Sequence, residues 1–331
     1  MDQLDLHLEP TNALPAEPTP LAAATVPVAI LLSTYNGAPF LPEQLQSLHD
    51  QTHPNWTLLW RDDGSSDGTC EIMRRFAGGP GAGRYVELAD GTHRGITGSF
   101  LSLLRQAPPG HVIAFADQDD IWLAEKLARG VAALGDPASA QPVLYCARQM
   151  LVGRRLRRLR RIGVSPRVGR LPPFPASLTQ NIATGCTVML NPAAARLVAG
   201  SRPPPGTLHD WWSYLLVGAA GGRLVVDPTP VVLYRQHGQN AVGAPHSFLL
   251  RGLMALRRGP EAFMTLFRQH VAALAGQPAL LSPQAREAVA LLERALAGGR
   301  TARLAALRRL PHLVRQTRLE TLLFRLWFLI G

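Results

Sequence analysis

Short apolar runs, each followed by polar residues, are the feature that most constrains the fold of this chain. Val28–Leu32, Trp56–Trp60 and His111–Phe115 are largely apolar, and each predicts a strand buried on both faces, as in a parallel sheet. Segments with apolar residues at helical spacing separate them, including Pro39–His49 and Ile96–Gln106. This alternation predicts an α/β fold with an open, mostly parallel sheet and helices on both faces.

The same patterns divide the chain into three parts. Residues 1–25 are rich in proline and predict a disordered tail, residues 26–243 form the α/β domain, and residues 244–331 form an amphipathic helical C-terminal region. Further helices are expected at Thr69–Phe76, Trp122–Leu134, Pro192–Ala199 and Asp210–Gly218. Further strands are expected at Tyr85–Leu88, Val143–Cys146, Cys186–Leu190, Leu224–Val226 and Val231–Tyr234.

Composition limits the classes of function. The 331 residues carry a net charge of +11, and because Lys126 is the only lysine this charge comes from arginine. The three cysteines show no C-x-x-C spacing, which argues against a disulfide framework or a zinc site and fits a reducing cytosol. The first 25 residues lack a secretory pattern, and no segment approaches the roughly 20 apolar residues of a spanning helix.

An acidic run, Asp117-Gln118-Asp119-Asp120-Ile121-Trp122, follows the predicted strand His111–Phe115. Open α/β sheets bind ligands at the carboxyl ends of their strands. Clustered carboxylates repel one another unless a cation is present, and oxygen ligands suit Mg²⁺ or Mn²⁺ bound to substrate phosphates. The run therefore predicts a metal–diphosphate site, with a solvated acidic turn or a helix cap as the alternative.

Two other polar loops end neighbouring strands: Thr34-Tyr35-Asn36 and Asp62-Asp63-Gly64-Ser65. Polar groups at adjacent strand ends converge on one crevice. A carboxylate there can accept the N3–H of uracil or thymine, and an aromatic ring can stack on the base. The alternative for the second loop is an ordinary Asp-Gly turn.

These motifs, in this order, closely resemble the family-2 glycosyltransferases of the GT-A fold. The resemblance spans about residues 27 to 243 and is most like the bacterial rhamnosyltransferase-type branch. Later motifs continue it: Thr184-Gly185-Cys186, His209-Asp210-Trp211-Trp212 and Tyr234-Arg235-Gln236-His237-Gly238. The resemblance implies a GT-A catalytic domain that transfers a sugar, with inversion, from a nucleoside diphosphate to an acceptor hydroxyl.

The resemblance also implies roles for individual residues. Asp119 would ligate the metal with Asp120 in support, and His237 would complete metal or diphosphate binding unless it is an ordinary surface residue. Asp210 is the candidate base, or else a helix cap. Arg235 would help to neutralise phosphate. The nucleotide-sugar set comprises Thr34, Tyr35, Asn36, Asp62, Asp63, Arg94, Asp117, Gln118, Trp122, His209 and Trp211, with core packing as the alternative for Trp122.

The expected partners are a UDP- or dTDP-sugar, with rhamnose as one candidate, and a glycan or lipid-linked acceptor of bacterial surface polysaccharide. The expected location is the cytoplasm, at the inner face of the membrane. The Leu/Arg helices Leu249–Arg258 and Arg303–Phe328 suit a membrane surface, core cover or a dimer contact; the basic run Arg154–Arg161 suits an anionic partner or a solvated insertion. A sugar nucleotidyltransferase and a basic nucleic-acid-binding protein are the alternatives, and nucleic acid is not an expected partner because base-stacking and helix-turn-helix patterns are missing.

Overall fold

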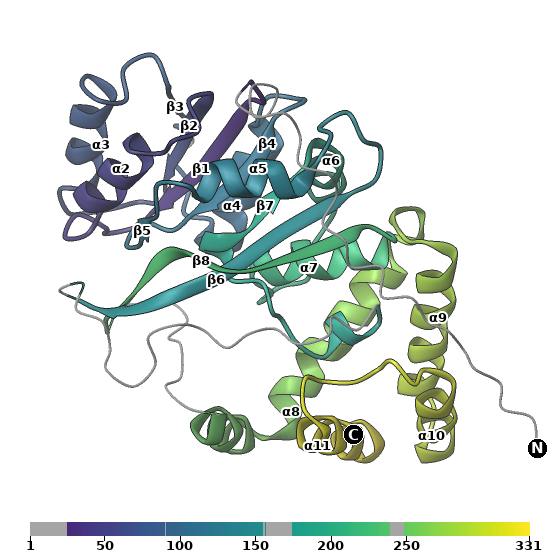
Figure 1. Cartoon of the computed structure of the whole chain (residues 1–331). Helices are drawn as coiled ribbons and strands as arrows, with labels where there is room; N and C mark the ends of the chain where they lie inside the picture. The colour runs from purple at the N-terminus through teal and green to yellow at the C-terminus, as the bar shows by residue number, and fades with distance from the viewer. Residues whose placement is uncertain (1–24, 90, 155, 157–173, 239–247) are drawn as a thin grey trace, which may run out of the picture.

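An eight-stranded sheet forms the centre of the protein in a computed structural model that describes residues 25–89, 91–154, 156, 174–238 and 248–331 (Figure 1). The strand order is β3-β2-β1-β4-β7-β6-β8-β5. The pairs β1–β2, β1–β4, β2–β3 and β6–β8 are parallel, whereas β7 is antiparallel to both its neighbours and β5 is antiparallel to β8. The strands are β1 Val28–Thr34, β2 Trp56–Asp62, β3 Tyr85–Glu87, β4 Val112–Ala116, β5 Ile121–Trp122, β6 Val143–Gly153, β7 Met189–Leu190 and β8 Arg223–Gln236.

Helices cover both faces of the sheet (Figure 1). Along β1, Val28, Ile30 and Leu32 belong to one buried cluster and Ala29 and Leu31 to another. Successive side chains of a strand point to opposite faces, so an apolar run of this kind must be buried twice. The helices are α2 Leu41–His49, α3 Thr69–Ala77, α4 Gly95–Gln106, α5 Lys126–Leu134, α6 Pro192–Ala199, α7 His209–Ala219, α8 Phe248–Ala275, α9 Pro283–Ala297, α10 Arg300–Arg309 and α11 Arg318–Ile330.

The predicted α/β class and sheet are confirmed, but several element boundaries were wrong. Trp122 does not begin a helix: it lies in β5, paired with Val232, and the helix begins four residues later at Lys126. Periodicity missed this because a two-residue strand leaves no pattern to detect. The segment Cys186–Leu190 is a 3-10 turn, Gly185–Thr187, followed by the short strand β7.

The two strands predicted at Leu224–Val226 and Val231–Tyr234 are one strand, β8. It runs parallel to β6, which extends to Gly153 rather than ending at Cys146. The register shifts beside Arg148, opposite the stretch of β8 that contains Pro228 and Pro230. Proline in a strand argues for an interruption, but an irregularity of this kind accommodates it without ending the strand.

The C-terminal helices share a core with the sheet. Phe267 of α8 and Phe324 and Phe328 of α11 belong to the same buried cluster as Phe115 of β4 and Trp212 of α7. The predicted boundary near residue 244 therefore separates segments of sequence whose apolar side chains pack together. Residues 1–24 of the predicted tail, and Arg155 and 157–161 of the basic run, lie outside the described residues. Within the described part of the chain, no helix is long and apolar enough to cross a membrane.

We predict that Gly222→Ala destabilises the junction before β8. A Cβ at Gly222 would lie 2.5 Å from the carbonyl oxygen of Pro142 and 2.8 Å from that of Val217, and backbone atoms cannot move aside cheaply. We expect unfolding by urea to show a loss of about 1–3 kcal/mol. Gly276→Ala is the matched control, because its nearest atom would lie at an ordinary 3.5 Å. Equal stability of the two variants would contradict the prediction.

Candidate active site

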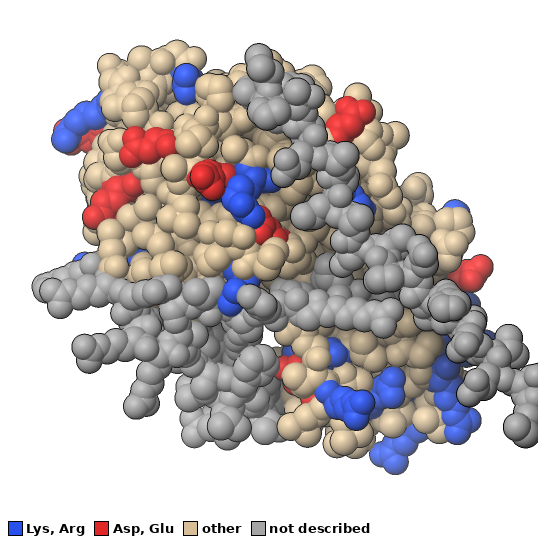
Figure 2. Space-filling view, in the orientation of Figure 1, with Lys and Arg blue, Asp and Glu red and all other residues tan. Residues whose placement is uncertain are grey.

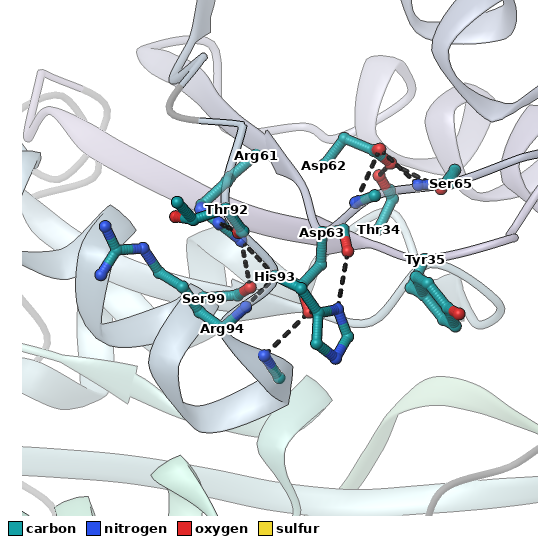
Figure 3. A network of polar contacts seen from close by, with 12 residues as sticks. Thr34, Tyr35, Arg61, Asp62, Asp63, Ser65, Thr92, His93, Arg94 and Ser99 are labelled. Atoms are coloured by element: carbon teal, nitrogen blue, oxygen red, sulfur yellow. Dashed lines mark hydrogen bonds and ion pairs between the residues drawn. The ribbon is translucent and has the colours of Figure 1, made fainter.

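The loops after β1 and β2 are joined by side chains at the carboxyl ends of the strands (Figure 3). The hydroxyl of Thr34 donates to Asp62 Oδ1 at 2.8 Å and accepts from Trp60 Nε1 at 2.9 Å. Asp62 also accepts from the hydroxyl and the amide of Ser65 at 2.6 and 2.7 Å. Thr34 and Asp62, both predicted to contact the nucleotide, therefore fix the loops to each other, and their contact with a nucleotide stays a prediction.

Tyr35 is held through its backbone, whereas Asn36 is held through both its amide and its side-chain oxygen. Gln118 accepts from the Tyr35 amide at 2.9 Å and donates to the Tyr35 carbonyl at 3.0 Å, so it connects the β1 and β4 loops. Asn36 has a φ of 49° and accepts from the Ser66 amide at 2.8 Å. The Tyr35 ring is 52% exposed and lies 5.6 Å from the His93 ring, which leaves one aromatic face available for a base.

Asp63 is buried and bonded to groups from β2 and from the start of α4. It pairs with Arg61 at 2.6 Å and accepts from the amides of Arg94 and Gly95 at 2.7 and 2.8 Å. Burial alone would raise the pKa of Asp63, but hydrogen bonds from the Arg94 amide, Arg61 and Ser99 together outweigh it, and the pKa lies below its usual value. Arg94 contributes its backbone here, and Figure 3 shows its side chain extending away from Tyr35.

The acidic turn after β4 carries three aspartates, Asp117, Asp119 and Asp120. Asp119 Oδ2 lies 2.8 Å from His237 Nε2, and the His237 ring stacks on Phe40 at 4.3 Å. One ligand atom each from Asp117, Asp120 and Cys186 lie within 4.8 Å of one another. Three carboxylates from the turn thus lie close to the imidazole of His237, which follows β8, and to the thiol of Cys186, which lies in the 3-10 turn before β7.

Burial and the charges of neighbouring carboxylates raise the pKa values of Asp117 and Asp120. Burial, with the charges of Asp119 and Asp210 added, raises the pKa of Asp117 to about 7, and burial also raises the pKa of Asp120. Asp120 Oδ2 is buried and has no hydrogen-bond partner among the described residues. A divalent cation would stabilise the ionised forms of Asp117 and Asp120 and would give Asp120 Oδ2 a partner, because such cations take oxygen ligands. The donor set therefore fits a hard divalent metal.

Two basic residues, Arg235 and Lys126, lie beside the acidic turn. The sequence analysis predicted a role in the site only for Arg235. Arg235 is buried; its amide donates to Asp120 Oδ1 at 3.0 Å, its Nε donates to the Asp119 carbonyl at 2.8 Å, and it pairs with Glu43. Arg235, proposed above to neutralise phosphate, thus anchors the turn to β8 and α2. Lys126 was missed. Lys126 is fully buried. Burial lowers its pKa to about 7, although the charges of Cys186, Asp117 and Asp120 act in the opposite direction.

The N-terminal turn of α7 contributes Asp210. Its carboxylate accepts from the amide of Gly185 at 3.0 Å and from that of Trp211 at 2.5 Å. Burial raises the pKa of Asp210 to about 6, although these amides and Asn181 oppose the shift. Leu208, not Asp210, is the N-cap residue of α7. Because the Asp210 charge also raises the pKa of Asp117, the predicted base and the acidic turn belong to one electrostatic site.

Three aromatic residues of the predicted nucleotide-sugar set pack against other rings or bonded groups: His209 and Trp122 are buried, and Trp211 is half-buried. His209 stacks on Phe100 at 3.9 Å, and burial lowers its pKa to about 3. Trp211 donates to the Ser177 carbonyl and packs edge-on against His270. Trp122 is buried beneath the amine of Lys126, which lies 3.2 Å from its ring centroid. The structure therefore gives all three packing contacts. Asp210 lies in the first turn of α7, and the remaining predicted residues lie at or just after strand ends or, for Arg94, at the start of α4.

The sheet, its helical layers and the acidic turn after β4 define an α/β enzyme of the GT-A class. The structure of residues 1–349 of TarS from S. aureus in complex with UDP-GlcNAc has this fold, with a TM-score of 0.55, 17% identity and coverage of 87% of this chain and 78% of that one. The sequence profile described as Glycosyl transferase family 2 matches residues 29–194, half of the chain. The chain belongs to that family.

Individual relatives are bacterial. The chain is 25% identical over 225 residues to a dTDP-rhamnosyl transferase, RfbG, of Shigella flexneri, covering 66% of this chain and 75% of that protein. It is 36% identical over 100 residues to WfgD of Escherichia coli, a UDP-Glc:alpha-D-GlcNAc-diphosphoundecaprenol beta-1,3-glucosyltransferase. That match covers 30% of this chain and 38% of the E. coli protein.

We predict that Asp63→Asn destabilises the protein by about 3–5 kcal/mol, because it removes the carboxylate charge that lies 2.6 Å from the buried guanidinium of Arg61. The pKa of Asp63 is lowered by folding, so its contribution is present above the ordinary carboxyl pKa near 4 and is lost as the pH falls through the folded value. Urea unfolding of wild type and variant from pH 7 to pH 3 should show the difference shrinking toward acid.

The control for this prediction is the double variant Arg61→Met/Asp63→Asn, which removes both members of the ion pair and should recover part of the lost stability. A pH-independent difference between wild type and Asp63→Asn would refute the ion-pair explanation.

Proposed function

We propose that the protein is an inverting glycosyltransferase that moves a sugar from a pyrimidine nucleoside diphosphate to an acceptor hydroxyl. The observation that carries the proposal is the pairing of Asp210, a buried carboxyl with a raised pKa, with the acidic turn after β4. Transfer from a diphosphate needs both a proton acceptor and positive charge near the leaving group. Family membership favours this activity over nucleotidyl transfer or nucleic-acid binding.

On the donor side, Asp119 and His237 would hold the metal, with Asp117 and Asp120 beside them. A bound Mg²⁺ or Mn²⁺ would stabilise the negative charge that accumulates on the departing diphosphate. The exposed face of Tyr35 would stack on the base, and the loops fixed by Gln118 and Asp62 would hold that ring in place. The site is thus organised before the donor binds.

On the acceptor side, Asp210 would remove the proton of the attacking hydroxyl. A pKa of about 6 keeps the group ionised at neutral pH, yet basic enough to accept a proton. The two amides that bond to Asp210, from Gly185 and Trp211, fix the orientation of the carboxylate. In this proposal the hydroxyl oxygen attacks the anomeric carbon as the bond to the diphosphate breaks, which inverts the configuration there.

The identity of both substrates is a finer part of the proposal. RfbG is named for a dTDP-sugar and WfgD for a UDP-sugar, and the TarS structure contains UDP-GlcNAc. All three donors carry a pyrimidine base, and we extend a pyrimidine nucleotide donor to this chain. WfgD acts on a diphosphoundecaprenol-linked sugar according to its name. We extend to this chain a glycan or lipid-linked acceptor of surface polysaccharide, reached from the cytoplasmic face of the membrane, with rhamnose as one candidate sugar.

We predict that UDP or dTDP raises the thermal unfolding temperature only when Mn²⁺ or Mg²⁺ is present, whereas GDP and ADP do not. At a ligand concentration 100 times Kd, the stabilisation would be about 2.7 kcal/mol. Asp119→Asn should abolish the metal-dependent part, because it removes a ligand oxygen. Asp50→Asn is the matched control, since Asp50 is an exposed carboxylate at the end of α2. An unchanged response of Asp119→Asn would remove Asp119 from the metal site.

We predict that Asp210→Asn lowers kcat by 10²–10⁴-fold and leaves nucleotide affinity nearly unchanged. The kcat of the wild type should rise with pH through an apparent pKa of about 6, because the base must be ionised. Asn181→Ala should move that rise to higher pH, since Asn181 lowers the pKa of Asp210. Initial-rate measurements from pH 5 to pH 8 test this, and an Asp210→Asn variant with a normal kcat would exclude Asp210 as the base.

A further inference from the structure

The outer face of α11 is apolar and exposed. Leu319, Leu322, Leu326 and Ile330 are 76%, 67%, 52% and 55% exposed, and their spacing of three and four residues places them along one stripe. Half of the large exposed hydrophobic side chains in the described part of the chain lie on this one helix. A cluster of this kind marks an interaction surface.

The opposite face of α11 already provides the core contacts. Phe324 lies 5.9 Å from Phe263 and 5.6 Å from Phe267, and Phe328 lies 5.8 Å from Phe267, so the helix is anchored on α8. Core cover therefore accounts for the inner face and leaves the leucine stripe outside. A helix of 13 residues is about 20 Å long, too short for a hydrocarbon layer of about 30 Å.

Positive charge surrounds the stripe. From Arg300 to Gly331 the sequence contains seven arginines and one acidic residue, Glu320. Figure 2 shows Lys and Arg side chains gathered over the part of the molecule where Figure 1 places α10 and α11. Arg318, Leu322 and Arg325 also line a surface pocket of about 450 Å³ at the start of α11, and Arg325 Nε has no hydrogen-bond partner among the described residues.

We propose that α11 docks the protein onto an anionic phospholipid bilayer, lying in the plane of the interface. The leucine stripe would enter the boundary between headgroups and acyl chains, while Arg318 and Arg325 would contact lipid phosphates. A second copy of this chain fits less well, because a symmetric contact through the stripe would bring the same arginines together. This inference assigns a surface to the membrane contact that the proposed function needs. It rests on the proposed function only for the biological role of that contact.

The test is co-sedimentation of the full chain with vesicles of phosphatidylglycerol and phosphatidylethanolamine, or of phosphatidylcholine alone, without nucleotide. We expect binding to the anionic vesicles to be at least tenfold tighter and to weaken as salt rises from 50 to 500 mM. Leu322→Glu should weaken it tenfold or more. Val86→Glu in β3 is the matched control, because Val86 is also an exposed apolar residue, 47% accessible. This variant should bind the vesicles like the wild type.

Two results would overturn the inference. One is equal binding of wild type and Leu322→Glu to anionic vesicles. The other is a dimer of the wild type in light scattering that Leu322→Glu abolishes without vesicles, which would assign the stripe to a second copy. An unchanged unfolding temperature would show that Leu322→Glu is folded. Because no nucleotide is present, failure here would leave the metal-dependent nucleotide response intact, and the two proposals can be judged separately.

Discussion

The concentration of negative charge after β4 is the constraint on which the rest of the site depends. Asp117, Asp119 and Asp120 lie within four consecutive positions, and burial raises the pKa values of Asp117 and Asp120. The groups that moderate this charge come from distant segments: Lys126 from α5, and Arg235 and His237 from β8 and its end. In the folded chain the turn is thus held by β8 and α5, and Asp120 Oδ2 has no hydrogen-bond partner among the described residues. Buried carboxylates with an unsatisfied oxygen are unfavourable for stability, and such local violations of stability rules are typical of functional sites.

Loop hydrogen bonds give the crevice its rigidity. Gln118 bonds to the backbone of Tyr35 and Asn36 bonds to the backbone of Ser66, so the ends of β1, β2 and β4 form one unit. Gly37 permits this closeness, because a Cβ there would lie 2.3 Å from the amide oxygen of Gln118. Several polar residues of these loops are bonded to one another, whereas Tyr35 is 52% exposed.

The sequence was sufficient to predict the α/β class, the main elements and the convergence of the loops, because apolar periodicity and strand-end polarity are local signals. It could not separate residues that touch a ligand from residues that support those residues. His209 and Asp210 are neighbours, yet one stacks in the core and the other bonds to the Gly185 amide. Lys126 gave one unused signal, as the only lysine, but its burial under the acidic turn depends on tertiary packing.

The C-terminal helices connect the outer stripe to the acceptor side of the site through packed rings. Phe263 and Phe267 of α8 contact α11, and one turn further along α8 His270 bonds to the Thr207 hydroxyl at 2.9 Å and packs on Trp211, the residue after Asp210. Close packing of this kind fixes relative positions rather than transmitting a signal. A bilayer bound along α11 would therefore hold the N-terminal turn of α7 at a constant height above the lipid, which is what the proposed roles of Asp210 as base and of a lipid-linked acceptor require.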